Sequence, residues 1–400
     1  MSATAKSGRI ASIDIIRGIA IVGMVLCANI GFQSDLPAWM FHAQTPPPTY
    51  AFNPDVPGIT WVDLVFPFFL FSMGAAFPFS MRKRLERGQS RWSVAGSLVK
   101  RWFILTLFAI VLGNAYSIWS TPRPAWQVHI YMIAVWAAMF LSLVRVQNPA
   151  GSDGWKKHLG TAVNLCGIIM FVALSFVFTR WFGLALSKDR CDIIIMILAV
   201  IAVTGGLIWM FTKDSIRLRW LIFMLVAAIK ALDSYAPEAL SFVPSCASVS
   251  WFFSWDWLQY LLIVLPGSIV GDMILKHSRS GEKPQIGRNG AIAGYVALAA
   301  ALVQLWGLFT RHVTADFIIS GALAITFFCL TWKERNVYTG TARIGFLLLL
   351  AGIIFDPIDG GITKDHCNLS YVLTTGGMAA LTTAFLLMLE IRSDIKGRFI

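Results

Sequence analysis

Charged residues are scarce in this chain: of its 400 residues, only 14% are Asp, Glu, Lys or Arg. Soluble domains contain about 25%. Hydrophobic residues make up 57% and the mean hydropathy is +0.68, which excludes an ordinary soluble protein. The alternating segments of roughly 10 residues that form transmembrane barrels are also missing. Apolar runs of about 20 residues, long enough to cross a hydrocarbon core of ~30 Å, recur instead. The sequence therefore predicts an all-α, polytopic membrane protein.

We expect about twelve transmembrane helices in a single transmembrane domain that spans residues 1–400, since no shift in composition marks a soluble domain. The first segment lacks the short apolar core and cleavage site of a signal peptide, so we expect it to be retained. The predicted helices are 12–33, 61–81, 96–117, 128–146, 159–180, 192–211, 219–235, 255–275, 290–310, 315–332, 343–356 and 369–390.

Acidic residues are fewer than basic ones, 21 against 33, which gives a net charge of +12. Such an excess can indicate nucleic-acid binding, but here the basic residues gather in alternate connections between the predicted helices. This asymmetry is the positive-inside rule, and it predicts that both termini face the cytoplasm. Nucleic acid is therefore not an expected partner. The predicted cytoplasmic residues include Arg82, Lys83, Arg84, Arg87, Arg91, Lys156, Lys157, Lys213, Arg217, Lys276, Arg279, Arg392 and Lys396.

Cysteine is also rare, and the six residues show no metal-ligand spacing, so we expect no metal. Three lie inside predicted helices, where a small apolar filler is the ordinary interpretation. Three lie near the predicted outer side, where one disulfide and free thiols both remain open. The first group is Cys27, Cys166 and Cys329, and the second is Cys191, Cys246 and Cys367.

No GxSxG, HExxH, Walker or GxGxxG motif is present, but ionisable residues lie at the ends of the first two apolar segments. Such groups are costly in a bilayer and are functional candidates. Asp14 and Arg17 share a helix face, either as an interfacial ion pair or as a phosphate-binding pair. Asp63 follows Thr60 at the start of the second helix. It is either a first-turn capping residue or a functional carboxylate.

The predicted outer loop 34–60 is rich in proline and aromatic residues, which indicates an ordered loop. It contains His42, which is either a surface residue or a general base or acyl acceptor. Asn29 is a buried amide that serves helix packing or the site. The segment 251–257 is dense in aromatics, as in an interfacial belt or a sugar-stacking surface.

A second polar cluster lies in the predicted outer loop before the last helix. Its charged residues are ordinarily solvated, but Lys364 and the polar start of the following helix suit an anionic or polar ligand. In the seventh helix, Lys230 and Asp233 are expected to pair with each other. The candidate ligand-binding residues of this last loop and helix are Lys364, Asn368, Ser370 and Tyr371, and the other charges are Asp356, Asp359, Asp365 and His366.

These motifs resemble, in order, the heparan-α-glucosaminide N-acetyltransferase family of membrane acyltransferases. The similar segments are IDIIRG at 13–18, Asn29 followed by Gly31, HA at 42–43, DLVFPFF at 63–69, PGSIVG at 266–271, TK at 363–364 and LSYVLTT at 369–375. The resemblance covers residues 9–105 and 255–390. It implies a family member that stops two helices short of the usual pattern.

The resemblance implies acyl transfer across a bacterial inner membrane. Acetyl-CoA, bound from the cytosol near Asp14 and Arg17, would donate its acyl group to an amino sugar or hydroxyl of an envelope glycan. His42 would deprotonate the acceptor or carry the acyl group, Asn29 would polarise the thioester, and Asp63 would complete the catalytic group. A transporter or flippase of a lipid-linked sugar, and a non-catalytic family member, stay open as alternatives. The oligomeric state stays open too, a homodimer included.

Overall fold

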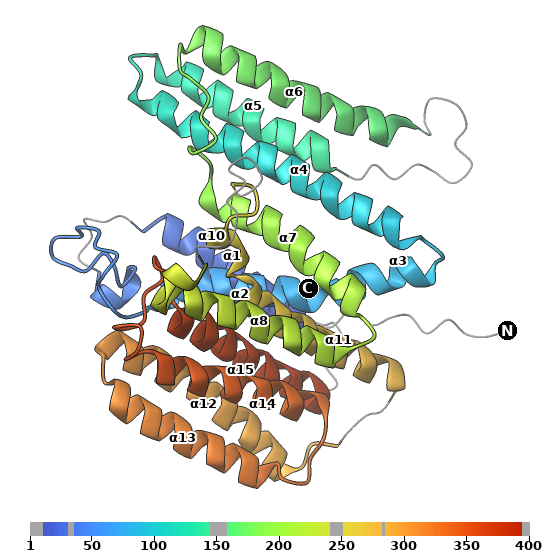
Figure 1. The fold of residues 1–400 in the computed structure, drawn as a ribbon, viewed down its shortest axis with the longest axis vertical. Helices are drawn as coiled ribbons and strands as arrows, with labels where there is room; N and C mark the ends of the chain where they lie inside the picture. Colours follow the sequence, from blue (N-terminus) through green and yellow to red (C-terminus); the bar gives the residue numbers. More distant parts are fainter. Residues whose placement is uncertain (1–10, 31–35, 145–157, 241–250, 282–284, 394–400) are drawn as a thin grey trace. The chain divides into compact units, whose positions relative to one another are not determined.

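The structure is a computed structural model that describes residues 11–30, 36–144, 158–240, 251–281 and 285–393 (Figure 1). Every regular element in these ranges is helical, which confirms the all-α prediction. Within them, eleven helices are long and apolar enough to cross a membrane. The chain is therefore a multi-pass membrane protein. The orientation of its termini stays a prediction, as does its organisation as one domain.

The predicted span 219–235 is a helix, α8 (Ile216–Tyr235), but it falls outside the eleven. Every stretch of 18 residues in α8 contains at least three charged residues. One of them, Arg219, is fully buried and its Nη1 lies 2.6 Å from Asp272 Oδ2. Pairing of this kind is how a membrane protein accommodates charge away from lipid. The predicted pair of Lys230 and Asp233 is confirmed, with 3.8 Å between Nζ and Oδ2.

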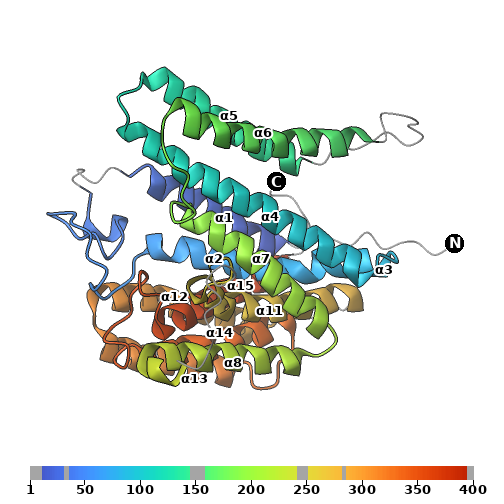
Figure 2. The same cartoon turned by 45° about the horizontal axis from the view of Figure 1, so that its top comes forward.

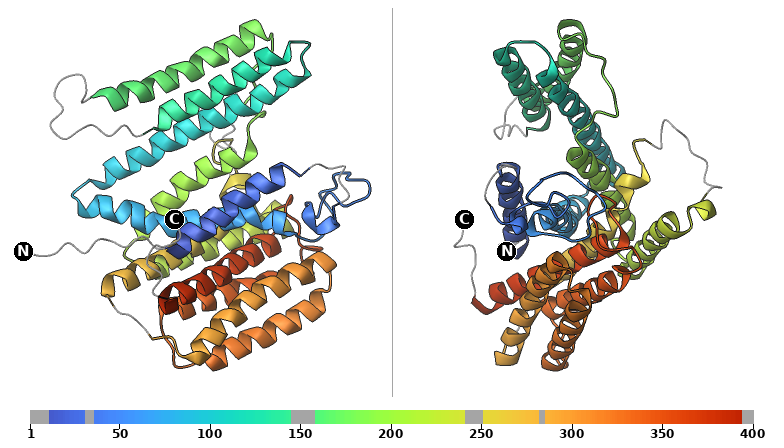
Figure 3. Two further views of the ribbon diagram at one scale, coloured as in Figure 1. Left: turned by 180° about the vertical axis from the view of Figure 1, so that it is seen from behind. Right: turned by 90° about the vertical axis from the view of Figure 1, so that its left-hand side faces the viewer.

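The described chain divides into two compact units. The first contains the loop 36–60 and most helices, with α11 and α15 the most deeply buried. Helices α1 and α2 pack together as a hairpin, and α12 to α15 lie side by side (Figure 3). Its helices are α1 (Ala11–Ala28), α2 (Trp61–Phe77), α3 (Lys83–Glu86), α8, α11 (Leu261–Ser280), α12 (Arg288–Thr310), α13 (Val313–Leu330), α14 (Val337–Phe355) and α15 (Leu369–Ser393).

The PGSIVG segment of α11 packs directly on the backbone of α2. A Cβ atom added to Gly267 would lie 2.3 Å from the carbonyl oxygen of Phe71, and one on Gly271 would lie 2.3 Å from that of Ala75. Small residues allow two membrane helices to approach this closely, and dispersion then holds them together. This contact fixes α2, whose first turn carries Asp63.

The second unit comprises α4 (Arg91–Tyr116), α5 (Ala125–Leu143), α6 (Leu159–Trp181), α10 (Trp255–Leu258) and most of α7 (Ile193–Thr212). Helices α4, α5 and α6 lie side by side (Figure 2). The aromatic segment that begins at Trp251 packs within this unit: Phe253 stacks on Trp102 at 5.5 Å between ring centroids, and Phe252 contacts the same ring edge-on. Much of this aromatic cluster is therefore used in internal packing.

The cysteines of the described chain form no disulfide. Cys191 and Cys367, two of the three residues for which a disulfide stayed open, are therefore not bridged. The third, Cys246, lies outside the described residues.

Candidate functional site

The loop 36–60 is ordered by its own polar and aromatic contacts, as predicted. Phe41 packs edge-on against Tyr50, with ring centroids 4.9 Å apart. Gln44 is fully buried, and its amide nitrogen donates to the carbonyl of Val56 at 3.0 Å and to that of Gly58 at 3.3 Å. These bonds close the loop on itself and hold its His42 end beside the start of α2.

Asp63 begins α2 in the manner of a capping residue. Its Oδ2 accepts the Thr60 backbone N–H at 3.0 Å and the Ala43 N–H at 3.4 Å, while the Thr60 hydroxyl donates to the carbonyl of Phe41 at 2.7 Å. The carboxylate is completely buried. The capping interpretation of Asp63 is therefore confirmed, but it occupies only one of the two carboxylate oxygens.

The other oxygen of Asp63 faces His42. The distance from Oδ1 to the His42 Nδ1 is 2.5 Å, typical of a short charge-assisted hydrogen bond. Because Oδ1 can only accept, this contact requires the proton to sit on Nδ1. The second ring nitrogen, Nε2, then carries a lone pair. About a third of the His42 side chain is exposed.

Lys364 completes the cluster from a loop far along the chain. Its Nζ lies 3.1 Å from His42 Nδ1 and 3.7 Å from Asp63 Oδ1. With Nδ1 donating to Asp63, the lysine acts as the ionic partner of the same carboxylate. Cys27, near the end of α1, interacts electrostatically with Lys364 and Asp63, which places that end of α1 close to the cluster.

The loop between α14 and α15 is held in place by a partly buried ion pair that the sequence did not reveal. Arg311 donates to both oxygens of Asp356 at 2.9 Å, and Asp356 Oδ1 also accepts the Ile362 N–H at 2.7 Å. The carbonyl of Ile362 accepts the Gly58 N–H at 2.8 Å. Asp356 is buried, so the expectation that this charge is solvated was wrong. It instead fastens the Lys364 loop to the His42 loop.

Gly361 shows why this loop needs a glycine. Its φ is +112°, and an added Cβ would lie 2.5 Å from a side-chain atom of Pro57. Neither the conformation nor the space admits a larger residue. The contact brings the two loops together just before Lys364.

The other predicted ligand-binding residues support this loop from inside. Tyr371 donates its hydroxyl to the Asp63 carbonyl at 2.9 Å, Asn368 donates to the Gly361 carbonyl at 2.8 Å, and Ser370 donates its hydroxyl to Asn368 at 3.0 Å. All three are buried, with Ser370 and Tyr371 almost completely so. Burial of Ser370 and Tyr371 favours a supporting role for them over direct contact with a substrate.

Three further predicted site residues lie in α1 or directly after it. Asn29, which follows the last residue of α1, is exposed, so the expectation of a buried amide was wrong; its side-chain nitrogen donates to the Val25 carbonyl at 2.7 Å. Asp14 and Arg17 lie at the opposite end of α1, 3.7 Å apart. With a rise of 1.5 Å per residue, about 16 Å of helix separates Arg17 from Ala28. The structure thus brings together His42, Asp63 and Lys364, while Asp14 and Arg17 lie toward the other end of α1.

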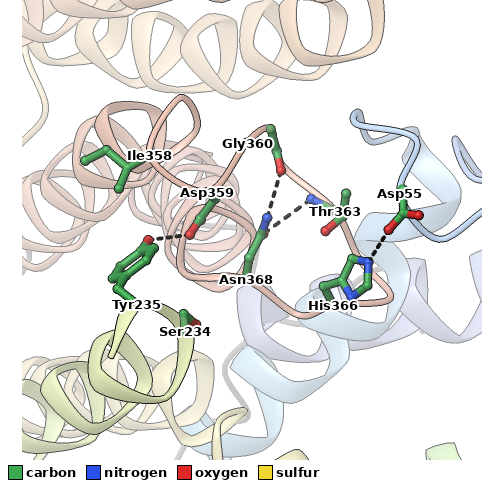
Figure 4. Close-up of a pocket in the computed structure, with 10 residues that line it drawn as sticks. Asp55, Ser234, Tyr235, Ile358, Asp359, Gly360, Thr363, His366 and Asn368 are labelled. Carbon is green, nitrogen blue, oxygen red and sulfur yellow. Dashed lines mark hydrogen bonds and ion pairs between the residues drawn. The ribbon is translucent and has the colours of Figure 1, made fainter. Parts of the chain in front are cut away.

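A polar pocket of about 500 Å³ adjoins the Lys364 loop (Figure 4). In Figure 4, His366 and Asp55 meet on one side and Tyr235 and Asp359 on the other. Thr363, which precedes Lys364, also lines it. Burial and then the Asp359 carboxylate raise the pKa of the Tyr235 hydroxyl, so it remains a donor. The pocket therefore offers carboxylates, hydroxyls and an aromatic ring, which suit a polyhydroxylated or amine-bearing ligand.

This arrangement could act as a general base, because His42 pairs with a buried carboxylate at the start of α2. Asp63 selects the His42 tautomer and would stabilise its protonated form, as the third member of a catalytic triad does. The class of protein defined by fold and site is thus a multi-pass helical membrane protein with an Asp–His–Lys cluster, whose lysine loop also borders a polar pocket.

Comparison with known proteins agrees with this class. The family model described as Domain of unknown function (DUF5009) matches residues 9–274, more than half of the chain, so the chain belongs to that family. Human heparan-alpha-glucosaminide N-acetyltransferase is 36% identical over 107 residues, which are 26% of this chain and 14% of the human protein. The mouse enzyme of the same name is 32% identical over 109 residues, 27% of this chain and 14% of its own length. The chain thus matches about one seventh of each relative, and the family-level relationship is confirmed.

Proposed function

We propose that this protein is a membrane acyltransferase that moves an acetyl group from acetyl-CoA to an amine or hydroxyl of an envelope glycan. The observation that carries the proposal is the His42–Asp63 pair with Lys364 beside it, on a loop whose Thr363 lines a polar pocket. The names of the two similar enzymes, both N-acetyltransferases that act on a glucosaminide, support the same chemistry. We also propose the bacterial inner membrane as its location.

In this mechanism His42 Nε2 removes a proton from the acceptor as its nitrogen or oxygen attacks the thioester carbonyl. The bond between the acetyl carbon and the acceptor forms, the carbon–sulfur bond breaks, and CoA leaves as a thiolate that takes up the proton from His42. Asp63 holds the ring and balances the transient imidazolium charge. The cation of Lys364 is close enough to stabilise negative charge that develops on the thioester oxygen.

We assign the acceptor to the pocket beside the Lys364 loop. Asp55 and His366 form its exposed side, and Asn368 and Thr363 form the side that leads to Lys364. The two carboxylates of the pocket make it unsuitable for the phosphates of CoA, since like charges repel. An uncharged or cationic sugar fits this electrostatic environment better.

For the donor, Arg17 is the residue at the other end of α1 that suits a phosphate, because a guanidinium binds phosphoryl oxygens with two parallel bonds. The start of α1 itself does not suit an anion, since Glu390 already accepts the N–H groups of Ala11 and Ser12 at 3.0 Å each. Asp14 would orient Arg17 rather than touch CoA. Acetyl-CoA bound there would have to reach along α1 toward His42.

The first experiment is calorimetric titration of the protein, in detergent or nanodiscs, with acetyl-CoA and with desulfo- and dephospho-CoA as controls. We expect specific binding, and acetyl transfer to glucosamine or a related amino sugar. His42→Ala should abolish transfer and keep CoA binding. His277→Ala, a change in the last turn of α11, serves as the matched histidine control and should keep both.

Full transfer activity in His42→Ala would overturn the catalytic assignment. A folded protein that binds no acetyl-CoA would overturn the acyltransferase proposal as a whole and favour a transporter on the same scaffold.

A further inference from the structure

An apolar pocket lies between α5 and α6 in the second unit, and none of the candidate site residues lines it. Its volume is about 320 Å³, and no acidic residue lines it. The buried side chains of Tyr131, Leu174 and Phe182 form its floor. The Tyr131 hydroxyl donates to the Leu174 carbonyl at 3.0 Å, so even this polar atom is satisfied internally. The pocket thus accepts an apolar ligand.

The rim of this pocket has the composition of a membrane–water interface. Trp126 and Trp181 line it and are both largely exposed. The indole N–H of Trp181 donates to Gln127 Oε1 at 3.3 Å, which links α6 to α5 across the opening. Tryptophan at the ends of membrane helices marks the headgroup level of the bilayer. The pocket therefore extends from headgroup level toward the acyl region.

A cation stands at the same rim. Arg123 is exposed, its Nη2 donates to the Trp181 carbonyl at 2.7 Å, and its guanidinium lies 6.0 Å from the centre of the Trp181 ring. A guanidinium has five N–H donors, and this hydrogen bond uses one of them. Helix α5 begins at Ala125, so the positive end of its dipole lies at this end of the pocket. Arg180 adds a second exposed cation on α6.

We propose that this pocket binds one acyl chain of an anionic phospholipid, with the lipid phosphate held by Arg123 and the start of α5. The charge at the rim selects an anionic headgroup, and the apolar interior selects a hydrocarbon chain. A transmembrane helix, about 10–12 Å across, is too wide for a space of this volume. The site does not depend on the acyltransferase proposal.

The test is native mass spectrometry of the purified protein with phosphatidylglycerol and phosphatidylcholine of identical acyl chains. We expect phosphatidylglycerol to bind about fivefold more tightly, the preference that one cation near a membrane surface confers. Arg123→Gln should remove the preference, while Lys188→Gln, which changes a cation beside Trp251 elsewhere in the unit, should keep it.

Filling the pocket tests the acyl chain separately. Ala134→Phe should weaken binding of both lipids, and Ala137→Phe, one turn further along α5 and outside the pocket, should not. Equal binding of the two lipids to the wild type, or an unchanged preference in Arg123→Gln, would overturn the proposal. Tighter binding of a polyprenyl phosphate than of phosphatidylglycerol would overturn the phospholipid as its occupant. Melting temperatures confirm that each variant is folded.

Discussion

Replacement of Asp63 by Asn is the most informative change at the proposed site. Asn has the same shape but no charge, and its amide has one acceptor and one donor group. Its oxygen can still accept the Thr60 N–H that Asp63 Oδ2 accepts at 3.0 Å. Its NH₂ group would then face His42 Nδ1, where Oδ1 stands at 2.5 Å in the wild type.

An NH₂ group in that position forces His42 into the other tautomer. Nδ1 must then accept, the proton moves to Nε2, and the ring can no longer take a proton from an acceptor. General-base catalysis contributes roughly 10²–10⁴-fold, so we expect kcat to fall by that factor. The KM for acetyl-CoA should change little, since Arg17 lies toward the other end of α1.

The cost in stability should be smaller than the loss of activity. Asp63 is fully buried, but its partners His42 and Lys364 are each about one third exposed, so solvent screens the charge that loses its partner. Breaking a fully buried pair costs about 3–5 kcal/mol, and an exposed pair up to about 1 kcal/mol. We expect about 1–2 kcal/mol, seen as a lower melting temperature of a protein that remains folded.

The assay is transfer of labelled acetyl groups to an amino sugar, with kcat and KM measured for Asp63→Asn, His42→Ala and the double variant. Because the two residues act as a unit, the double variant should be no slower than His42→Ala. A folded Asp63→Asn protein with kcat within threefold of the wild type would refute the role of Asp63. Strictly multiplicative losses would show that the two side chains act independently.

Three further changes test other parts of the structure. Arg17→Ala should weaken acetyl-CoA binding in calorimetry more than it lowers kcat at saturating CoA, because a phosphate contact exists in the ground state and the transition state alike. Unchanged affinity for acetyl-CoA would exclude Arg17 from the donor site. Arg311→Gln leaves the buried Asp356 without its partner and should cost about 1–3 kcal/mol in thermal unfolding and reduce transfer. Arg279→Gln breaks the exposed pair with Glu86 and should cost less than about 1 kcal/mol; equal losses for the two variants would contradict this account. Gly267→Val places a side chain against the Phe71 carbonyl and should prevent stable folding in detergent; a stable Gly267→Val would disprove the close α2–α11 contact. The control Gly18→Ala, with open space around its Cβ position, should stabilise α1 by about 0.5–1 kcal/mol.

The helices could be predicted because each is a long apolar run whose length is set by the bilayer, and this signal does not depend on tertiary contacts. The helix α8 was also predicted, but it falls outside the eleven apolar spans because Arg219 interrupts its pattern. Arg219 is paired with Asp272, 53 residues away, and also donates to Thr212 and Ser268. A residue whose environment is formed by a distant helix cannot be assigned from its own segment.

The candidate site shows the same division. Thr60 and Asp63 are three residues apart, so the cap of α2 could be predicted from local sequence. The contact of His42 with Lys364 joins residues 322 positions apart. It depends on Arg311, Asp356 and Gly361, which fix two loops against each other, and no local pattern reports such a contact. Arg311 and Asp356 are each common loop residues whose pairing is visible only in the fold.

The dual position of Asp63 explains why its structural and functional interpretations could not be separated in the sequence. One oxygen begins α2 and ties the Ala43 backbone to it, and the other orients His42. The Asp63 carboxylate, which caps the start of α2 through the Thr60 N–H, therefore also fixes the position of His42 relative to that helix. A carboxylate used only in the capping box would tolerate Asn, whose side-chain oxygen can still accept the Thr60 N–H. If Asp63→Asn keeps the helix cap, and thus a folded protein, but loses acetyl transfer, Asp63 is catalytic. If it keeps both, Asp63 is only structural.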